Sequence, residues 1–153
     1  MADSFFVNIT ARLPDALGPD AVRIIDYVLG EGERAPEAFP DHVFFTFNGH
    51  SVPRYHGFYG LGADRYRFSL SRIKGFGYYL QVSIFALKGV DGYHRFLLFL
   101  DWLARLGVAD QVLGCAGVVN HMDAVDLIVC KNGMLYVDPK KGFSDTCQPV
   151  NAG

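Results

Sequence analysis

Two histidines and two tyrosines lie close together in one glycine-rich stretch, and they are the first side chains to consider for chemistry. They are His50, Tyr55, His56 and Tyr59, within residues 49–64. Because histidine titrates near neutral pH, His50 or His56 could act as a general acid or base, with residues 49–64 serving as a lid. Zinc sites combine histidines with cysteines or carboxylates at short spacings, which this stretch lacks. Surface histidines in a loop are the plainer interpretation, and the sequence predicts no metal and no cofactor.

The cysteines are the second possible source of chemistry. Cys115 could be combined with His121 and Asp123 as nucleophile, base and orienting group, but a reactive cysteine needs an electropositive, partly exposed environment. Small apolar residues surround Cys115, and Cys130 ends an expected strand, so both are predicted to lie in the core. Three cysteines without a Cys-x-x-Cys pair are typical of a reducing cytoplasm.

Familiar catalytic motifs are absent from the sequence. Residues 57–62 end in Gly-x-Gly but match neither the dinucleotide-binding nor the P-loop pattern, and no Gly-x-Ser-x-Gly or His-Glu-x-x-His occurs. No glutamate follows Glu37, so paired catalytic carboxylates would have to be aspartates, and none of these lie beside one another convincingly. The sequence therefore predicts no catalytic residues and a protein that is not an enzyme.

The elements that would position these groups follow from hydrophobic periodicity. Alternating apolar residues predict strands, and apolar residues at helical spacing predict helices at 19–29 and 93–106. Because turn residues join consecutive strands, most clearly Asn132-Gly133, the sheet should be mainly antiparallel, with both helices packed on one face. The sequence thus predicts an α+β fold of about six to seven strands in the order β-α-β-β-β-α-β-β-β. The strands are expected at residues 5–12, 42–48, 65–73, 78–87, 111–119, 125–130 and 134–137.

Length and composition favour one domain in the cytoplasm. Half of the 153 residues are apolar, which is enough for one hydrophobic core. Residues 1–153 are therefore predicted to form a single globular domain, with residues 140–153 as a loose or surface-strapped tail. The N-terminus lacks the basic and apolar regions of a signal peptide, and the longest apolar run, Phe96 to Leu100, is too short to cross a bilayer.

Charge is distributed unevenly along the chain. Residues 1–50 carry a balance of −5, whereas residues 51–100 carry +5, and the net charge of −2 disfavours nucleic acid as a partner. One interpretation is a set of solvated faces that pair with each other. The sharper interpretation is a recognition surface, because arginine and tyrosine are enriched at the hot spots of protein interfaces. The residues predicted to bind a partner are Arg54, Tyr55, His56, Tyr59, Arg65 and Arg67.

The order of segments in residues 65–138 is informative. A hairpin leads into an aromatic helix, and a strand of small residues, a polar turn and a final apolar strand follow. The segments are Phe68-Ser69-Leu70-Ser71, Gln81-Val82-Ser83-Ile84, Tyr93 to Leu103, Gly114-Cys115-Ala116-Gly117 and Leu127-Ile128-Val129. This order resembles small cytoplasmic immunity proteins of bacterial toxin systems, although the turn has Asp123-Ala124 where such families carry an acidic residue and a proline. The resemblance implies a non-enzymatic protein that binds a cognate toxin tightly and blocks its active site or substrate access.

Three functions remain as hypotheses from the sequence. The first is a cytoplasmic binding protein of the immunity type, whose partner is a cognate protein toxin or effector and neither nucleic acid nor a membrane. The second is a small enzyme or ligand-binding module that uses residues 49–64. The third is a homo-oligomeric structural protein, such as a homodimer, in which exposed aromatic residues form a self-interface.

Overall fold

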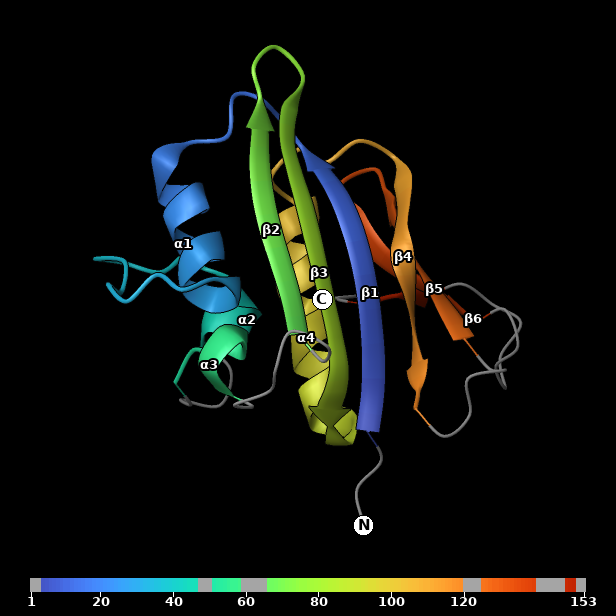
Figure 1. Ribbon diagram of the computed structural model, residues 1–153. Helices are drawn as coiled ribbons and strands as arrows, with labels where there is room; N and C mark the ends of the chain where they lie inside the picture. Colours follow the sequence, from blue (N-terminus) through green and yellow to red (C-terminus); the bar gives the residue numbers. More distant parts are fainter. Residues whose placement is uncertain (1–3, 47–50, 59–65, 120–124, 140–147, 151–153) are drawn as a thin grey trace.

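The computed structural model describes residues 4–46, 51–58, 66–119, 125–139 and 148–150, and the structural statements below concern these residues. Within them, an antiparallel sheet and two long helices make up most of the regular structure (Figure 1). The elements in chain order are β1 (Ser4–Leu13), α1 (Pro19–Leu29), α2 (Val43–Thr46), α3 (Tyr55–Phe58), β2 (Tyr66–Ile73), β3 (Gly77–Lys88), α4 (Gly89–Ala104), β4 (Gln111–Val118), β5 (Val125–Lys131), β6 (Met134–Pro139) and β7 (Gln148–Pro149).

The sheet has seven strands in the order β2-β3-β1-β4-β5-β6-β7, and every neighbouring pair is antiparallel. Its two faces differ. Along β1, Val7 and Ile9 are buried, whereas Asn8 and Thr10 are exposed, because successive side chains of a strand point to opposite faces. In Figure 1, α4 lies behind the sheet and so packs on the face that carries the buried side chains. We call this the covered face and the other the open face.

The second long helix, α1, packs on the covered face beside β2. Tyr66 of β2 lies opposite the buried Ile84 of β3, which places its side chain on the covered face. The Tyr66 hydroxyl donates a hydrogen bond to the carbonyl of Leu29, the last residue of α1. The predicted α+β fold, with a mainly antiparallel sheet and both long helices on one face, is therefore confirmed.

The strand predicted at residues 42–48 is wrong, because α2 is a short helix. Its Phe44 and Phe45 are adjacent in sequence and both are buried, which a strand cannot achieve against a single core. Their rings pack on two aromatic rings of α4, at centroid distances of 5.1 and 5.3 Å. His42 starts the turn, since its Nδ1 accepts a hydrogen bond from the Phe44 amide at 3.1 Å. The strand order predicted from the sequence loses this one strand, and β7 restores the total of seven.

A buried polar cluster ties α2, α4 and β6 together. Asp101 of α4 is fully buried and accepts hydrogen bonds from His42 Nε2 at 3.0 Å and Arg105 Nε at 2.9 Å. Its second oxygen accepts from the Leu135 amide at 3.5 Å. Burial alone would raise the pKa of Asp101, but the bonds from His42 and Arg105 outweigh it and hold this pKa below its ordinary value. Asp101 is thus a charged anchor for three elements.

Glycines with positive φ determine the backbone conformation of two hairpin turns. Asn132 and Gly133 have φ values of 54° and 73°, as the predicted two-residue turn between β5 and β6 requires. In the turn between β2 and β3, Gly75 and Gly77 also have positive φ. A Cβ on Gly77 would lie 2.2 Å from the carbonyl oxygen of Leu13, so this glycine allows the hairpin to approach the end of β1.

The described part of the tail closes one edge of the sheet. Gln148 and Pro149 form β7, which pairs with Val137 and Tyr136 of β6. The next amide, that of Val150, donates to the carbonyl of Leu135 at 2.9 Å. The remainder of the predicted tail lies outside the described residues. None of the helices in the described ranges is both long and apolar enough to cross a membrane.

Candidate functional site

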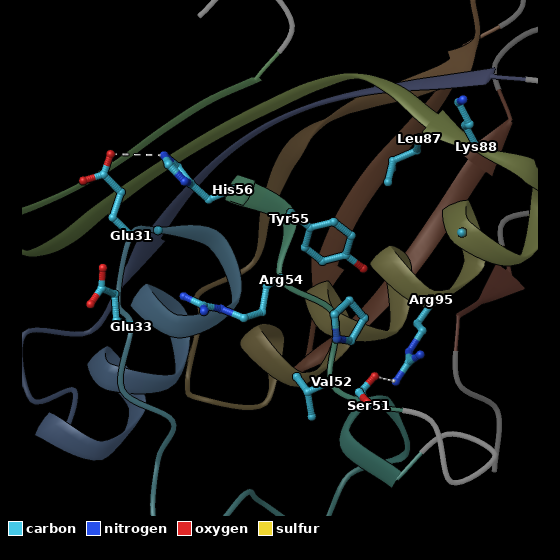
Figure 2. Close-up of a pocket in the computed structure, with 13 residues that line it drawn as sticks. Glu31, Glu33, Ser51, Val52, Arg54, Tyr55, His56, Leu87, Lys88 and Arg95 are labelled. Atoms are coloured by element: carbon cyan, nitrogen blue, oxygen red, sulfur yellow. Dashed lines mark hydrogen bonds and ion pairs between the residues drawn. The ribbon is translucent and has the colours of Figure 1, made fainter. Parts of the chain in front are cut away.

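A pocket of about 1090 Å³ lies between the end of α1, the segment before α3, the end of β3 and the start of α4 (Figure 2). Residues 30–33 and 51–56 supply most of its lining, and α4 contributes Gly92 and Arg95. We call it the loop pocket. Its apolar side chains include Val52 and Leu87, and charged side chains stand around them.

The sequence-predicted partner-binding residues are partly brought together here. Arg54, Tyr55 and His56 line the loop pocket, whereas Arg67 lies on the open side of β2 in a neighbouring recess that His56 also lines. Tyr59 and Arg65 lie outside the described residues, as does His50. Three consecutive residues of the predicted set therefore share one pocket.

Arg54 fastens the pocket segment to α1. Its Nε donates to the carbonyl of Tyr27 at 3.1 Å, and its Nη2 donates to the carbonyl of Gly32. Its guanidinium also stacks on the Tyr27 ring, 4.3 Å from the centroid. Arginine suits this position because its planar fork can donate to two carbonyls while its face covers an aromatic ring. Arg54 thus fixes the shape of the pocket wall.

Tyr55 lies inside the molecule instead of on the outer surface that the sequence suggested. Only 4% of it is exposed, and its ring packs edge-on against Phe96 of α4 at a centroid distance of 5.1 Å. Its hydroxyl points away from Arg54 and towards α4 (Figure 2). Any ligand meets Tyr55 only by entering the loop pocket.

His56 forms an exposed ion pair with the end of α1. Its Nε2 lies 3.3 Å from Glu31 Oε1, and the side chains are 40% and 84% exposed. The imidazole also packs edge-on against the Tyr66 ring. Exposed pairs of this kind add little stability. A carboxylate beside an imidazole can orient it for proton transfer, so this pair is the arrangement on which an acid–base role would depend.

Arg95 was not among the predicted partner-binding residues, yet it stands at the α4 side of the pocket. Its Nη2 donates to the carbonyls of Ser51 at 3.0 Å and Phe44 at 3.3 Å. Burial lowers the pKa of Arg95, and the nearby Tyr55 partly offsets this. Helical spacing alone could not find Arg95, because its role depends on the fold of residues 44–51. With Lys88 it makes the α4 side of the pocket basic.

The acidic side of the loop pocket belongs to the end of α1. Glu31 and Glu33 line it there, opposite Lys88 and Arg95 (Figure 2). The uneven charge along the sequence is therefore partly resolved within the fold. Acids of the first fifty residues face bases of the next fifty, as His56 with Glu31 and Arg72 with Asp15 also do.

Two further recesses continue from the loop pocket along α1. One, of about 860 Å³, shares Gly30, Glu31 and His56 with the loop pocket and spreads over the open face, where Thr10 of β1 and Gln81 of β3 line it. The next, of about 570 Å³, lies between α1 and the β2–β3 hairpin and shares Asp26 and Phe68 with the previous one. We call this second recess the edge groove. It lies between α1 and β2.

The other groups with perturbed titration are structural. Burial raises the pKa of Tyr66, Tyr93 and Cys130. Cys130 is fully buried, and its thiol donates to the carbonyl of Val108, which confirms its predicted core position. Cys115 is only half-buried and faces the open side of β4, and its suggested companions His121 and Asp123 lie outside the described residues.

No metal-binding set is found in the described ranges, where no three His, Cys, Asp or Glu side chains gather closely enough. What the loop pocket offers instead is an apolar interior with basic and acidic sides. Comparisons of this chain with protein families, with curated proteins and with solved structures find no match, so the resemblance of residues 65–138 to immunity proteins stays a prediction.

Proposed function

We propose that this chain is a non-enzymatic binding protein of the immunity type, which acts in the cytoplasm by binding a cognate toxin and blocking its active site. The observation that carries the proposal is the loop pocket. It forms where the segment with Arg54, Tyr55 and His56 folds against α1 and α4. An apolar pocket with charged sides suits an anchoring side chain of a protein partner, because desolvated anchors supply most interface affinity.

The wall of the loop pocket is preorganised for such a partner. Arg54 holds residues 51–56 to α1 through two carbonyls, and Arg95 holds Ser51 to α4. A partner that enters the pocket would therefore pay little of the entropy that is needed to order a loop. The opposed charges of Lys88 and Glu31 would orient the partner and raise its association rate at low salt.

The direct test uses the protein encoded by the adjacent gene. We expect it to be a toxin that co-purifies with this chain and loses its activity in the complex. Absence of binding by the neighbouring product would contradict the proposal. Association should also slow as salt is raised, because the charged sides of the pocket are screened over about 10 Å at 0.1 M salt.

A pair of matched variants locates the contact. Val52→Asp places a charge in the loop pocket, whereas Val43→Asp places the same charge on α2, outside the pocket lining. We expect the first to weaken toxin binding by about tenfold or more and the second to leave it unchanged. Because Val52 also packs on the core, the exposed Lys88→Glu is a second test, with the exposed Lys131→Glu as its control. If the two variants of each pair bind the toxin with equal affinity, the loop pocket is not the contact site.

A small-molecule function is the second candidate, and the volume of the loop pocket favours it. Pockets of about 300–1,000 Å³ are typical of ligand sites. His56→Ala separates the two functions, because it removes the imidazole that pairs with Glu31. Under the immunity function, neutralisation should fall only as far as toxin binding falls, because His56 acts only as part of the pocket wall. Loss of the biological phenotype with toxin binding intact would favour an enzyme.

A further inference from the structure

The β2 strand forms one outer edge of the sheet. In the described residues its only strand partner is β3, which pairs with it from Tyr66 to Ile73. In an edge strand, half of the backbone N–H and C=O groups point away from the sheet and can pair with another strand. The edge groove runs along this side of β2, between it and α1.

This edge has little of the protection that edge strands usually carry. Natural edges are blocked by prolines, bulges or charged residues along their length. The β2 strand has no proline, its pairing with β3 shows no register shift, and its basic residues stand near the ends, at Arg67 and Arg72. The four residues between them, Phe68 to Ser71, are uncharged. At the centre of this edge an added strand would meet no charged side chain of β2 itself, and Asp26 of α1 lies in the groove beside Phe68.

The two sides of β2 specify what the added strand should contain. On the covered side, Phe68 and Leu70 line the groove together with Val22 of α1, so apolar side chains fit against these three residues. The charged Arg23 and Asp26 of α1 line the groove as well. On the open side stand Arg67, Ser69 and Ser71, in alternation with them. The whole hairpin is basic, since residues 66–88 contain four Lys or Arg and no Asp or Glu. Acidic side chains suit the open side.

We propose that β2 binds an extended acidic segment of the protein partner as an additional strand of the sheet. Apolar residues of this segment point into the edge groove, and the acidic residues that alternate with them lie beside Arg67 and Ser69. The proposal rests on the proposed function only in taking the segment from the partner. It adds a mode of recognition, strand addition, and the sequence pattern that this mode selects.

Synthetic peptides test the pattern directly. The probe is a fluorescein-labelled peptide of eight residues, the length of β2, that alternates valine and aspartate. One control peptide has the same composition in two blocks, and another has lysine in place of aspartate. By fluorescence anisotropy at about 0.15 M salt, we expect the alternating acidic peptide to bind about tenfold more tightly than either control. No binding, or equal binding of the three peptides, overturns the proposal.

Two matched variants place the peptide at the edge. Thr10, Gln81 and Ser69 lie in one cross-strand row of the open face, on β1, β3 and β2. Ser69→Glu puts a negative charge beside the added strand, and Thr10→Glu puts the same charge about 10 Å further from it. We expect the first to weaken peptide binding about tenfold and the second by less than about threefold, because salt screens the longer distance. Equal effects would contradict edge binding.

Amide hydrogen exchange gives a readout that a general change in stability would not imitate. Peptide addition should slow exchange in β2 and leave β6 unchanged. Equal slowing across the sheet would contradict strand addition. A second copy of this chain is the competing occupant: if sedimentation shows a dimer that Ser69→Glu dissociates, the edge serves self-association and the proposal fails.

The two proposals fail separately. If the neighbouring toxin binds but the alternating peptide does not, strand addition is wrong and the proposed function stands. If the peptide binds at β2 but the toxin does not bind, the immunity function is wrong and the recognition site stands.

Discussion

The two edges of the sheet differ in how they are covered. At the β6 edge, β7 pairs with Tyr136 and Val137, and Val150 packs against the core beside Leu135. At the β2 edge, eight residues have no outer strand in the described part of the chain, and a groove lies beside Phe68 and Leu70. The chain thus closes one edge with its own C-terminal segment and leaves the other next to a recess. In the described residues only the β6 edge is covered by a further strand. This difference is expected if the β2 edge binds a partner.

The closed edge is also fastened from within. Asp101 accepts a hydrogen bond from the Leu135 amide of β6, and the same carboxylate holds His42 and Arg105. The β2 strand is anchored to a helix by the hydrogen bond from the Tyr66 hydroxyl to the carbonyl of Leu29, at the end of α1. We therefore expect the stability of β6 to depend on the buried carboxylate of Asp101, and the stability of β2 to depend on its pairing with β3 in the hairpin.

Removing the buried carboxylate should have the largest effect. Asp101→Ala leaves the buried His42 and the Leu135 amide without their acceptor, so we expect the free energy of unfolding to fall by about 3 kcal/mol or more. Amide exchange in β6 should accelerate more than in β2. The control is Asp91→Ala, an exposed aspartate in the first turn of the same helix, which should cost about 0.5 kcal/mol. If urea unfolding shows the same loss of stability for both variants, the buried polar cluster does not hold these elements together.

A change in the hairpin turn should weaken the other edge. In Gly77→Ala the new Cβ would meet the Leu13 carbonyl at 2.2 Å in a residue with φ of 121°. We expect a loss of about 2–3 kcal/mol. Gly75→Ala is the matched control, because its φ of 86° is also positive but no atom lies within 4 Å of the new Cβ, and it should cost about 1 kcal/mol. If the two variants lose the same free energy of unfolding, the close approach of Gly77 to the end of β1 does not contribute to stability.

Deleting β7 should make the two edges alike. Removal of residues 148–153 takes away the pairing with β6 and the bond from the Val150 amide, for an expected loss of about 1–2 kcal/mol. Exchange at Tyr136 and Val137 should rise, and the shortened chain should self-associate at high concentration through its newly opened edge. Unchanged exchange there would mean that β7 does not protect β6.

The smallest effect is a change with pH. The pKa of Asp101 is lower in the folded protein than its ordinary value of 3.8, so the unfolded chain binds the proton more readily. The stability contributed by Asp101 is therefore fully present above this value and is lost as the pH falls through the lower pKa of the folded state. Urea unfolding of Asp101→Asn should lack this acid-side loss, whereas Asp91→Asn should keep it. If Asp101→Asn still loses stability as the pH falls, the loss comes from other carboxylates.

Local pattern was sufficient for most of the fold. Alternation identified β1 and the β2–β3 hairpin, and Asn132-Gly133 identified the turn between β5 and β6, because these signals depend on neighbours in sequence. The α2 segment was missed because two adjacent phenylalanines resemble a strand, and only packing against α4 makes a helical turn the better burial. The extent to which β7 covers the edge also depends on contacts distant in sequence.

The candidate site was only partly within reach of the sequence. The stretch that contains Arg54, Tyr55 and His56 was found from its residue types, but their roles were not. Arg54 binds the carbonyls of Tyr27 in α1 and of Gly32 beyond the end of α1, and Tyr55 is buried against α4. Only the tertiary fold determines these contacts. The edge groove had no signal in sequence, since it arises from the position of α1 relative to β2.

The interior position of β1 in the sheet has a consequence for how the chain is made. The β1 strand precedes both of its neighbours in the chain, β3 and β4, which are completed only when Lys88 and Val118 have been synthesised. Until Lys88 has been made, the apolar row of Val7, Ile9 and Ala11 has no sheet to join, and until Val118 has been made the other side of β1 stays unpaired. Folding that depends on such distant pairings is slow and exposes apolar surface to aggregation. Fast translation of residues 14–118 should therefore improve the yield of folded protein.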